Sequence, residues 1–222
     1  NIYMEKRNQK GIIGEYLFSY GKDSVNRTSL INHLICKYKF KKYLEIGVRN
    51  PNDNFNLIKS NDKVGVDPNP LVNINSIKRQ TSDEFFESIN SDVKFDVIFI
   101  DGLHLEYQCT RDISNSLHHL NDNGFILVHD CNPPTEHHQI ETYDGKSPWN
   151  GTVWKSIAKL RMSNSHLRIN TIDTDTGVGI ITKEHNKNTT IKKEENLDWN
   201  YLQNNRNEIL NLMNVHDFLS IY

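Results

Sequence analysis

The sequence predicts an α/β fold: a doubly wound, mostly parallel, seven-stranded sheet with helices on both faces. Five apolar runs alternate with helix-like segments, and parallel strands need such helical crossovers between them. The run at residues 95–100 is almost uninterruptedly apolar, which is typical of a strand buried on both faces. A similar run at residues 124–130 follows about one strand–helix–strand unit later, so both are expected near the middle of the sheet.

The order of apolar periods and turn residues gives the expected elements. Strands are expected at residues 42–48, 63–67, 74–79, 95–100, 124–130, 167–172 and 178–182, the last two as a hairpin. Helices are expected from Asn26 or Thr28 to Tyr38, from Pro51 to Lys59, from Ser82 onward, and at residues 106–120, 151–162 and 199–218. We treat the chain as one domain with an N-terminal helical lid (1–40), an α/β core (41–183) and a C-terminal helical appendage (184–222).

Bulk properties exclude several classes of protein. The chain has 222 residues, 36% of them hydrophobic, which suits a single domain. Its net charge of −2 gives no electrostatic footprint for a nucleic acid. No window approaches the length of apolar sequence that spans a membrane. Three cysteines without CxxC spacing predict reduced thiols and a cytoplasmic location.

Polar residues stand at the ends of the two central strands. Asp101 ends the run at residues 95–100, with His104 close behind it, and the pair His129-Asp130 ends the next strand. In open α/β sheets, ligands bind beyond the carboxyl ends of the strands, so these residues form the candidate reaction centre. Simpler interpretations remain open, because either aspartate could cap the following helix and His104 could lie on the surface.

A second group of residues surrounds the first strand and predicts a cofactor site. Glu45 precedes the turn at Gly47, and Asp67 ends the second strand, 22 residues after Glu45. An acid at this position can bind ribose hydroxyls. The turn lacks the G-x-G-x-x-G pattern, because Val48-Arg-Asn-Pro51 follows Gly47, and this disfavours NAD or FAD.

These motifs together resemble a known family. Tyr43-Leu-Glu-Ile-Gly47, Val64-Gly-Val-Asp67, Asp101-Gly-Leu-His104 and His129-Asp130 look like the motifs of class I S-adenosylmethionine-dependent methyltransferases, which have a Rossmann-like fold. The resemblance covers residues 27–182 and is closest to the macrocin-type and glycan O-methyltransferases of methyltransferase family 24. It implies S-adenosyl-L-methionine as cofactor and a sugar hydroxyl of a glycan, polysaccharide precursor or glycosylated metabolite as acceptor.

The resemblance also implies roles on the cofactor side. Glu45, Gly47 and Asp101 would contact the cofactor, with Glu45 and Gly47 against its methionine part, and Asp101 would also take part in the reaction. Asp67 would bind the ribose hydroxyls. Ser82 and Asp83 would lie near the adenine.

The reaction side would hold Mg²⁺ or another divalent cation. Asp101 and the pair His129-Asp130 match the family's metal ligands, and His104 matches its proposed base. His129 stands where the family often has an acid. If His129 is a ligand, it favours Mn²⁺ or a transition metal over Mg²⁺; otherwise it would lie behind the ligands. The cation would orient the acceptor hydroxyl and lower its pKa.

The long segment at residues 131–150 is expected to form a substrate wall, because long loops in compact domains are usually functional or disordered. His137 and Trp149 are its candidate substrate contacts, since aromatic rings stack well on sugars. Both have ordinary alternatives, a surface position for His137 and a loop anchor or core position for Trp149.

Three alternatives to the cation-assisted O-methyltransferase stay open. They are a metal-independent methyltransferase with another small-molecule acceptor, a non-catalytic or cofactor-sensing protein, and a dinucleotide-dependent enzyme. Whether the chain forms a homo-oligomer is also open.

Overall fold

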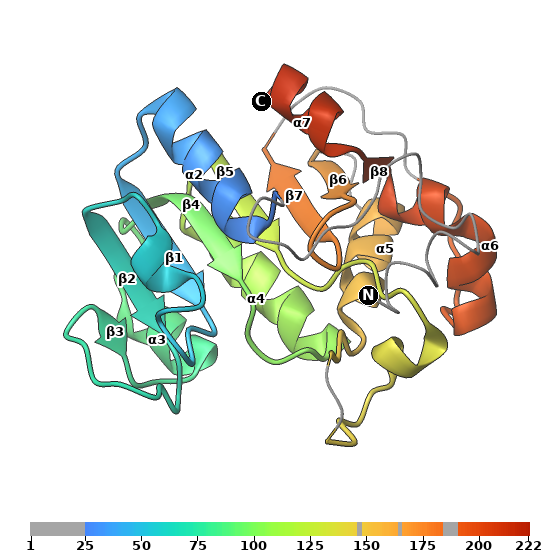
Figure 1. Cartoon of the computed structure of the whole chain (residues 1–222), viewed down its shortest axis with the longest axis horizontal. Coiled ribbons are helices and arrows are strands. Elements are labelled where there is room, and N and C mark those ends of the chain that lie inside the picture. Colours follow the sequence, from blue (N-terminus) through green and yellow to red (C-terminus); the bar gives the residue numbers. More distant parts are fainter. Residues whose placement is uncertain (1–24, 146–147, 164–165, 184–190) are drawn as a thin grey trace.

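The computed structural model describes residues 25–145, 148–163, 166–183 and 191–222. Its strands form one sheet in the order β3-β2-β1-β4-β5-β7-β6-β8, which runs from β3 on the left of Figure 1 to β6 and β8 on the right. The strands are β1 (Lys42–Ile46), β2 (Asp62–Val66), β3 (Ile77–Lys78), β4 (Phe95–Ile100), β5 (Leu120–Val128), β6 (Arg168–Ile172), β7 (Val178–Thr182) and β8 (Leu212–Met213). The α-helices are α2 (Arg27–Tyr38), α3 (Ser82–Ser88), α4 (Glu106–His118), α5 (Val153–Ser163), α6 (Trp199–Leu210) and α7 (Val215–Ile221).

The sheet is mixed, with a parallel half that carries the site. β1 pairs in parallel with β2 and β4, and β4 pairs in parallel with β5. β7 is antiparallel to both β5 and β6, as the expected hairpin requires. The α/β class is therefore confirmed, but the expected count of seven strands was wrong, because β8 adds a short parallel strand beside β6.

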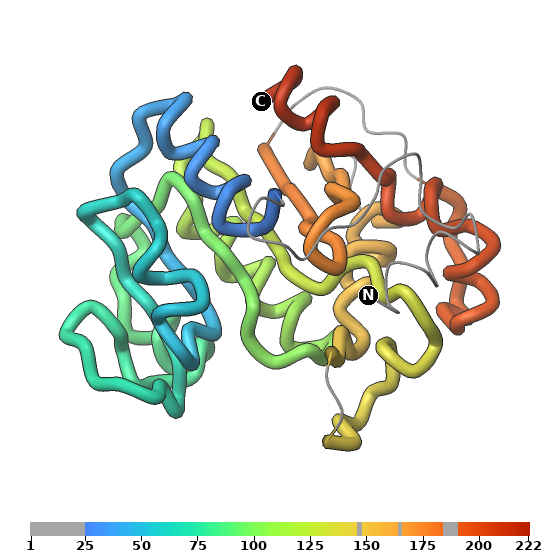
Figure 2. The backbone as a smooth tube through the Cα atoms, viewed as in Figure 1, coloured from blue at the N-terminus to red at the C-terminus, as the bar shows by residue number. Residues whose placement is uncertain are grey.

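Helices cover both faces of the sheet, and the side chains of β4 are divided between these two faces. Val97 and Phe99 belong to the cluster that includes the apolar side of α2, whereas Ile98 and Ile100 belong to the cluster beneath α3, α4, α5 and α6. Side chains alternate between the faces of a strand, so a strand covered on both faces must be apolar throughout. The backbone trace in Figure 2 shows α2, in blue, and α7, in red, on the same side of the sheet.

Two expected helices differ from the structure. Residues 51–59 contain only a 3₁₀ turn, η1 (Phe55–Leu57). Asn50 accepts a hydrogen bond from the backbone of Asn52 and donates one to Asp53, and such local side-chain bonds compete with helix formation. Helix α3, by contrast, begins at Ser82 as expected, with Thr81 as its cap through a capping box with Glu84.

The expected helix at 199–218 is interrupted. Asn211 adopts a left-handed conformation with φ 47°, which asparagine tolerates, and ends α6. Its side chain donates to Ile169 O at 2.9 Å, which ties this turn to β6. The chain then forms β8 and begins α7 with Asn214 as cap.

The N-terminal lid expected at 1–40 is described only from residue 25, and the appendage expected at 184–222 only from residue 191. Helix α2 buries Leu30, Ile31 and Leu34 against the sheet. Among the helices of the described ranges, none combines the length and the apolar composition that crossing a membrane requires.

Candidate active site

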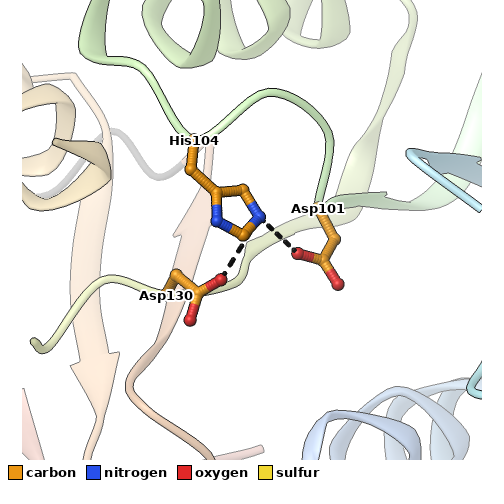
Figure 3. A group of neighbouring side chains, drawn as sticks. All are labelled: Asp101, His104 and Asp130. Atoms are coloured by element: carbon orange, nitrogen blue, oxygen red, sulfur yellow. Dashed lines mark ion pairs between the residues drawn. The ribbon is translucent and has the colours of Figure 1, made fainter. Parts of the chain in front are cut away.

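Two aspartates meet at the carboxyl ends of β4 and β5. Ile100 pairs with Val128 in the sheet, so Asp101 and Asp130 leave neighbouring strands at the same edge. His104 lies between them, with its Nε2 atom 3.4 Å from Asp101 Oδ1 and 3.4 Å from Asp130 Oδ2 (Figure 3). One ligand atom from each residue lies within 4.8 Å of the others, and we call these three residues the central cluster.

The orientation of His104 follows from its other nitrogen. Nδ1 lies 2.7 Å from the backbone oxygen of Trp149. A carbonyl oxygen only accepts, so Nδ1 must carry a hydrogen. In the neutral ring, the lone pair of Nε2 therefore faces Asp101 and Asp130.

Asp130 is held by two donors on its other oxygen. Asn150 Nδ2 and Thr176 Oγ1 each lie 2.7 Å from Asp130 Oδ1, which leaves Oδ2 facing the central cluster. The backbone of Asp130 has φ 61°, a left-handed conformation that is uncommon outside glycine and concentrates at functional sites.

His129 lies behind the two aspartates. Its Nδ1 is 3.3 Å from Asp101 Oδ1 and 3.2 Å from Asp130 Oδ2 and has no hydrogen bond of good geometry. On its far side, Arg27 Nη1 lies 3.0 Å from Nε2, and the same guanidinium pairs with Asp175 at 3.0 Å. Arginine only donates, so Nε2 accepts and the hydrogen of a neutral His129 belongs on Nδ1.

The site carries an excess of negative charge unless its histidines are protonated. Among the described residues, the carboxylates of Asp101, Asp130 and Asp175 face one guanidinium, that of Arg27, which leaves two negative charges to balance. Either two protons on the histidines or one divalent cation would balance them. Buried charge needs such compensation.

The pKa values of His104 and His129 reflect the same excess of negative charge. Burial alone would lower the pKa of His104, but its hydrogen bond to Asp101 and the charge of Asp130 raise it to about 9. Burial would also lower the pKa of His129, yet Asp130, Asp101 and Asp175 together raise it well above its ordinary value. Both rings therefore hold a proton more firmly than a free imidazole does, and a bound cation would compete with those protons for the carboxylates.

The glycine turn brings the first strand against the central cluster. Gly47 has φ 88°, and a Cβ at this position would lie 2.1 Å from the backbone oxygen of Asp101. Only glycine permits this approach. Glu45, buried just before the turn, accepts from Tyr43 Oη at 2.6 Å and from Asn54 Nδ2 at 2.9 Å, and burial raises its pKa to about 7.

Asp67 stands at the end of β2 beside the same turn. Its carboxylate accepts from the backbone N–H of Arg49 at 2.8 Å and of Asn69 at 2.7 Å. The side chain therefore braces the backbone that follows Gly47. It remains the acid that the sequence places for ribose hydroxyls.

Ser82 and Asp83 lie on the first turn of α3 and face α4. Gln108 Nε2 is 3.2 Å from both Ser82 Oγ and Asp83 Oδ1, and 3.0 Å from Asp112 Oδ1. Asp112 Oδ2 in turn lies 3.8 Å from where a Cβ on Gly102 would be. This network connects the expected adenine contacts to the residue after Asp101.

The two expected substrate contacts differ in their surroundings. His137 pairs with Asp144 at 3.5 Å, and about half of its side chain is exposed. The Trp149 ring stacks on His104, with a 5.2 Å centroid distance and 28° between the ring planes, and also packs against Tyr143. Of the two, Trp149 is the one in contact with the central cluster.

Arg27, Asn150 and Asp175 are site residues that sequence reasoning missed. Arg27 opens a helix and Asp175 lies in a turn between two strands, so each has an ordinary local role. Only the position of Asp175 in a loop beside β5 could have drawn attention to it. Nothing in the local pattern marks Asn150.

The parallel half of the sheet carries a glycine turn after β1 and acids at the ends of β2, β4 and β5. Residues 41–131, which contain β1 to β5 and most of this site, match the family model described as "Methyltransferase domain" (Methyltransf_24). No curated protein matches the sequence.

Solved structures share the fold at low sequence identity. A provisionally assigned caffeoyl-CoA O-methyltransferase from Staphylococcus aureus is 20% identical, covering 72% of this chain and 85% of its own, with a TM-score of 0.53. The S-adenosylhomocysteine-bound methyltransferase PaMTH1 from Podospora anserina is 15% identical, with coverages of 83% and 88% and a TM-score of 0.50. The sugar N-methyltransferase KedS8 from Streptoalloteichus is 9% identical, with coverages of 78% and 96% and a TM-score of 0.51. Residues 41–131 thus match a methyltransferase domain, and the chain shares the Rossmann-like fold of these methyltransferases.

Proposed function

We propose that this chain is a cation-assisted O-methyltransferase that transfers the methyl group of S-adenosylmethionine to a sugar hydroxyl. The observation that carries the proposal is the convergence of Asp101, Asp130 and His104 beside the Gly47 turn. The Gly47 turn, where the methyl donor would bind, lies against the backbone of Asp101, a member of this cluster.

On the cofactor side, Glu45 would accept from the ammonium group of the methionine part and Asp67 from the ribose hydroxyls. Ser82 and Asp83 would border the adenine. This assignment uses the resemblance to class I methyltransferases. The position of Glu45 supports the assignment of this side of the site. Glu45 is a buried acid two residues before Gly47, and the Gly47 turn lies against the backbone of Asp101.

The residues present suit a divalent cation. Asp101 and Asp130 each offer a carboxylate oxygen, and these atoms lie within 4.8 Å of each other and of a ring nitrogen of His104. Nδ1 of neutral His129 carries a hydrogen, so His129 would lie behind the cation ligands. Two carboxylates are a common ligand set for Mg²⁺, which keeps water or substrate oxygens in its other positions. When bound, such a cation would polarise the acceptor hydroxyl and offset the carboxylate charge that otherwise keeps His104 protonated.

The chain's own residues would then carry the proton and the alignment. Neutral His104 accepts the hydroxyl proton at Nε2 while its Nδ1–H stays bonded to Trp149. The acceptor oxygen forms a bond to the methyl carbon as the carbon–sulfur bond breaks, which leaves S-adenosylhomocysteine. The oxygen, methyl carbon and sulfur must lie in line, so burial and fixed side chains around the cluster matter for rate.

The sugar acceptor is inferred from the resemblance to glycan O-methyltransferases. KedS8, which shares the fold, is itself described as a sugar methyltransferase, although it methylates nitrogen. The test is incubation of the full chain with methyl-labelled S-adenosylmethionine, Mg²⁺ and a panel of nucleotide sugars and oligosaccharides. Labelled O-methyl sugar is expected, and label found only in a non-sugar acceptor would redirect the proposal.

A metal-independent methyltransferase is the second candidate. It is favoured by one observation, that protons on His104 and His129 can balance the buried carboxylates without a cation. Methyl transfer that persists in EDTA would select this candidate.

The pH dependence of cofactor affinity should report on Glu45. Because burial raises the pKa of Glu45 to about 7, the carboxyl is protonated below that pH and cannot pair with an ammonium group. We expect S-adenosylhomocysteine to bind about tenfold more tightly at pH 8 than at pH 6, by linkage to this single proton. Titration calorimetry of the wild type and of Glu45→Gln checks this. Equal slopes in the two proteins would assign the pH dependence to another group.

A further inference from the structure

Four consecutive residues just before α5 all contact the candidate site, and we call residues 149–152 the clamp segment. The backbone oxygen of Trp149 accepts from His104 Nδ1 at 2.7 Å. Asn150 Nδ2 donates to Asp130 Oδ1 at 2.7 Å. The backbone N–H of Thr152 donates to the backbone oxygen of His104 at 2.9 Å. The clamp segment therefore contacts two of the three members of the central cluster.

Gly151 lets the clamp segment lie directly against His104. A Cβ on Gly151 would lie 1.9 Å from the backbone oxygen of His104 and 2.8 Å from its Cβ. Its backbone also has φ 57°, which disfavours other residues. Any side chain here would push the clamp segment and His104 apart.

Asn150 acts on Asp130. The side chain is fully buried, and its amide shares Asp130 Oδ1 with the hydroxyl of Thr176. With both donors on one oxygen, the carboxylate cannot rotate freely, and Oδ2 stays directed at His104 and His129. The two hydrogen bonds therefore hold Asp130 Oδ1, and Asp130 Oδ2 faces the reaction side.

We propose that Asn150 and Gly151 are positioning residues, with Asn150 orienting Asp130 for a divalent cation and Gly151 setting His104 for proton transfer. The catalytic consequence rests on the proposed function. The two residues act through different members of the central cluster, so their variants should differ in what they lose. Groups that orient metal ligands typically change metal affinity or activity by about 10- to 100-fold when they are removed.

The first test measures Mn²⁺ affinity by electron paramagnetic resonance on the full chain, with Asn150→Ala against wild type. We expect Mn²⁺ binding to weaken by about 10- to 100-fold. The matched control is Asn121→Ala, which removes a 2.7 Å amide bond to Asp96 at the other end of β4 and β5. S-adenosylhomocysteine affinity within twofold of wild type shows that the Asn150→Ala variant is folded. Wild-type Mn²⁺ affinity in folded Asn150→Ala would overturn the role of Asn150.

The second test separates kcat from KM in Gly151→Ala. We expect a fall in kcat of about 10- to 100-fold, with the KM for S-adenosylmethionine and the Mn²⁺ affinity near wild type. Gly145→Ala is the control for Mn²⁺ affinity, because Gly145 also has a positive φ, 84°, but its Cβ would meet no atom within 4 Å. A kcat equal to wild type would overturn the role of Gly151. If Gly151→Ala does not fold, Thr152→Pro tests the same backbone contact by removing the N–H that donates to His104 O at 2.9 Å. The same fall in kcat is expected, and a kcat equal to wild type would overturn the proposed setting of His104 by this contact.

The outcomes distinguish this inference from the proposed function. Absence of Mn²⁺ binding and methyl transfer in the wild type would contradict the proposed function. Binding and transfer in the wild type that persist unchanged in the folded variants would contradict the positioning roles alone.

Discussion

Asp130→Asn is expected to lower kcat by about 10³-fold, because a cation worth several kcal/mol of transition-state stabilisation loses one of its two carboxylates. Asparagine keeps the size of the side chain and an oxygen that can accept from Asn150 and Thr176. The affinity for S-adenosylhomocysteine should stay within a few-fold, since Asp130 lies on the reaction side. Steady-state kinetics with added Mg²⁺ and Mn²⁺ titration of the same protein measure both effects.

The control for Asp130→Asn is Asp122→Asn, which removes a fully exposed acid that pairs with Lys183 only at 3.8 Å. It should leave kcat and Mn²⁺ affinity unchanged. A turnover near wild type in Asp130→Asn, together with insensitivity to EDTA, would remove the cation from the mechanism and leave the metal-independent candidate.

The second large effect is expected for His104→Ala. Loss of a general base typically costs about 10²- to 10⁴-fold in turnover, and His104 is the imidazole whose lone pair faces the two carboxylates. The KM for S-adenosylmethionine should change little. Pre-steady-state measurement of methyl transfer would show whether the chemical step itself is slowed.

The Mn²⁺ affinity of His104→Ala separates two roles for this side chain. Nε2 has a single lone pair, so it cannot bind a cation and take a proton at the same moment. If His104 acts as a base, its removal should leave the Mn²⁺ affinity close to that of the wild type. A loss as large as that in Asp130→Asn would instead identify His104 as a ligand, and an unchanged kcat would exclude both roles.

Residues at the strand ends could be predicted because they depend on a local pattern. An apolar run buried on both faces ends where a polar residue is tolerated, which placed Asp101 and Asp130 correctly at one edge of the sheet. Gly47 was found in the same way, from the turn that follows β1. The close approach of Gly47 to Asp101, however, appears only in three dimensions.

The partners of these residues could not be predicted because they come from distant, non-periodic segments. Arg27 and Asp175 are 148 positions apart and meet through a turn that looks like an ordinary hairpin connection. Asn150 follows a loop whose path the sequence does not specify. The missed break at Asn211 has a related cause, since its left-handed turn is stabilised by contact with β6 and not by the helix itself.

Trp149 makes contacts in the structure that its residue type alone does not predict. Its aromatic ring suggested stacking on a sugar, and that contact remains a prediction. In the structure its ring lies on His104 and its backbone oxygen fixes the tautomer of that histidine. An effect of Trp149→Ala on turnover would therefore not by itself demonstrate sugar binding.

Titration calorimetry of the full chain with S-adenosylhomocysteine, beside NAD as a comparison ligand, tests the central claim most directly. We expect saturable binding of S-adenosylhomocysteine, weakened in Glu45→Gln, and no binding of NAD, because the turn at Gly47 lacks the further glycines that a pyrophosphate requires. Binding of NAD without binding of S-adenosylhomocysteine would show that the Gly47 turn does not serve a methyltransferase cofactor.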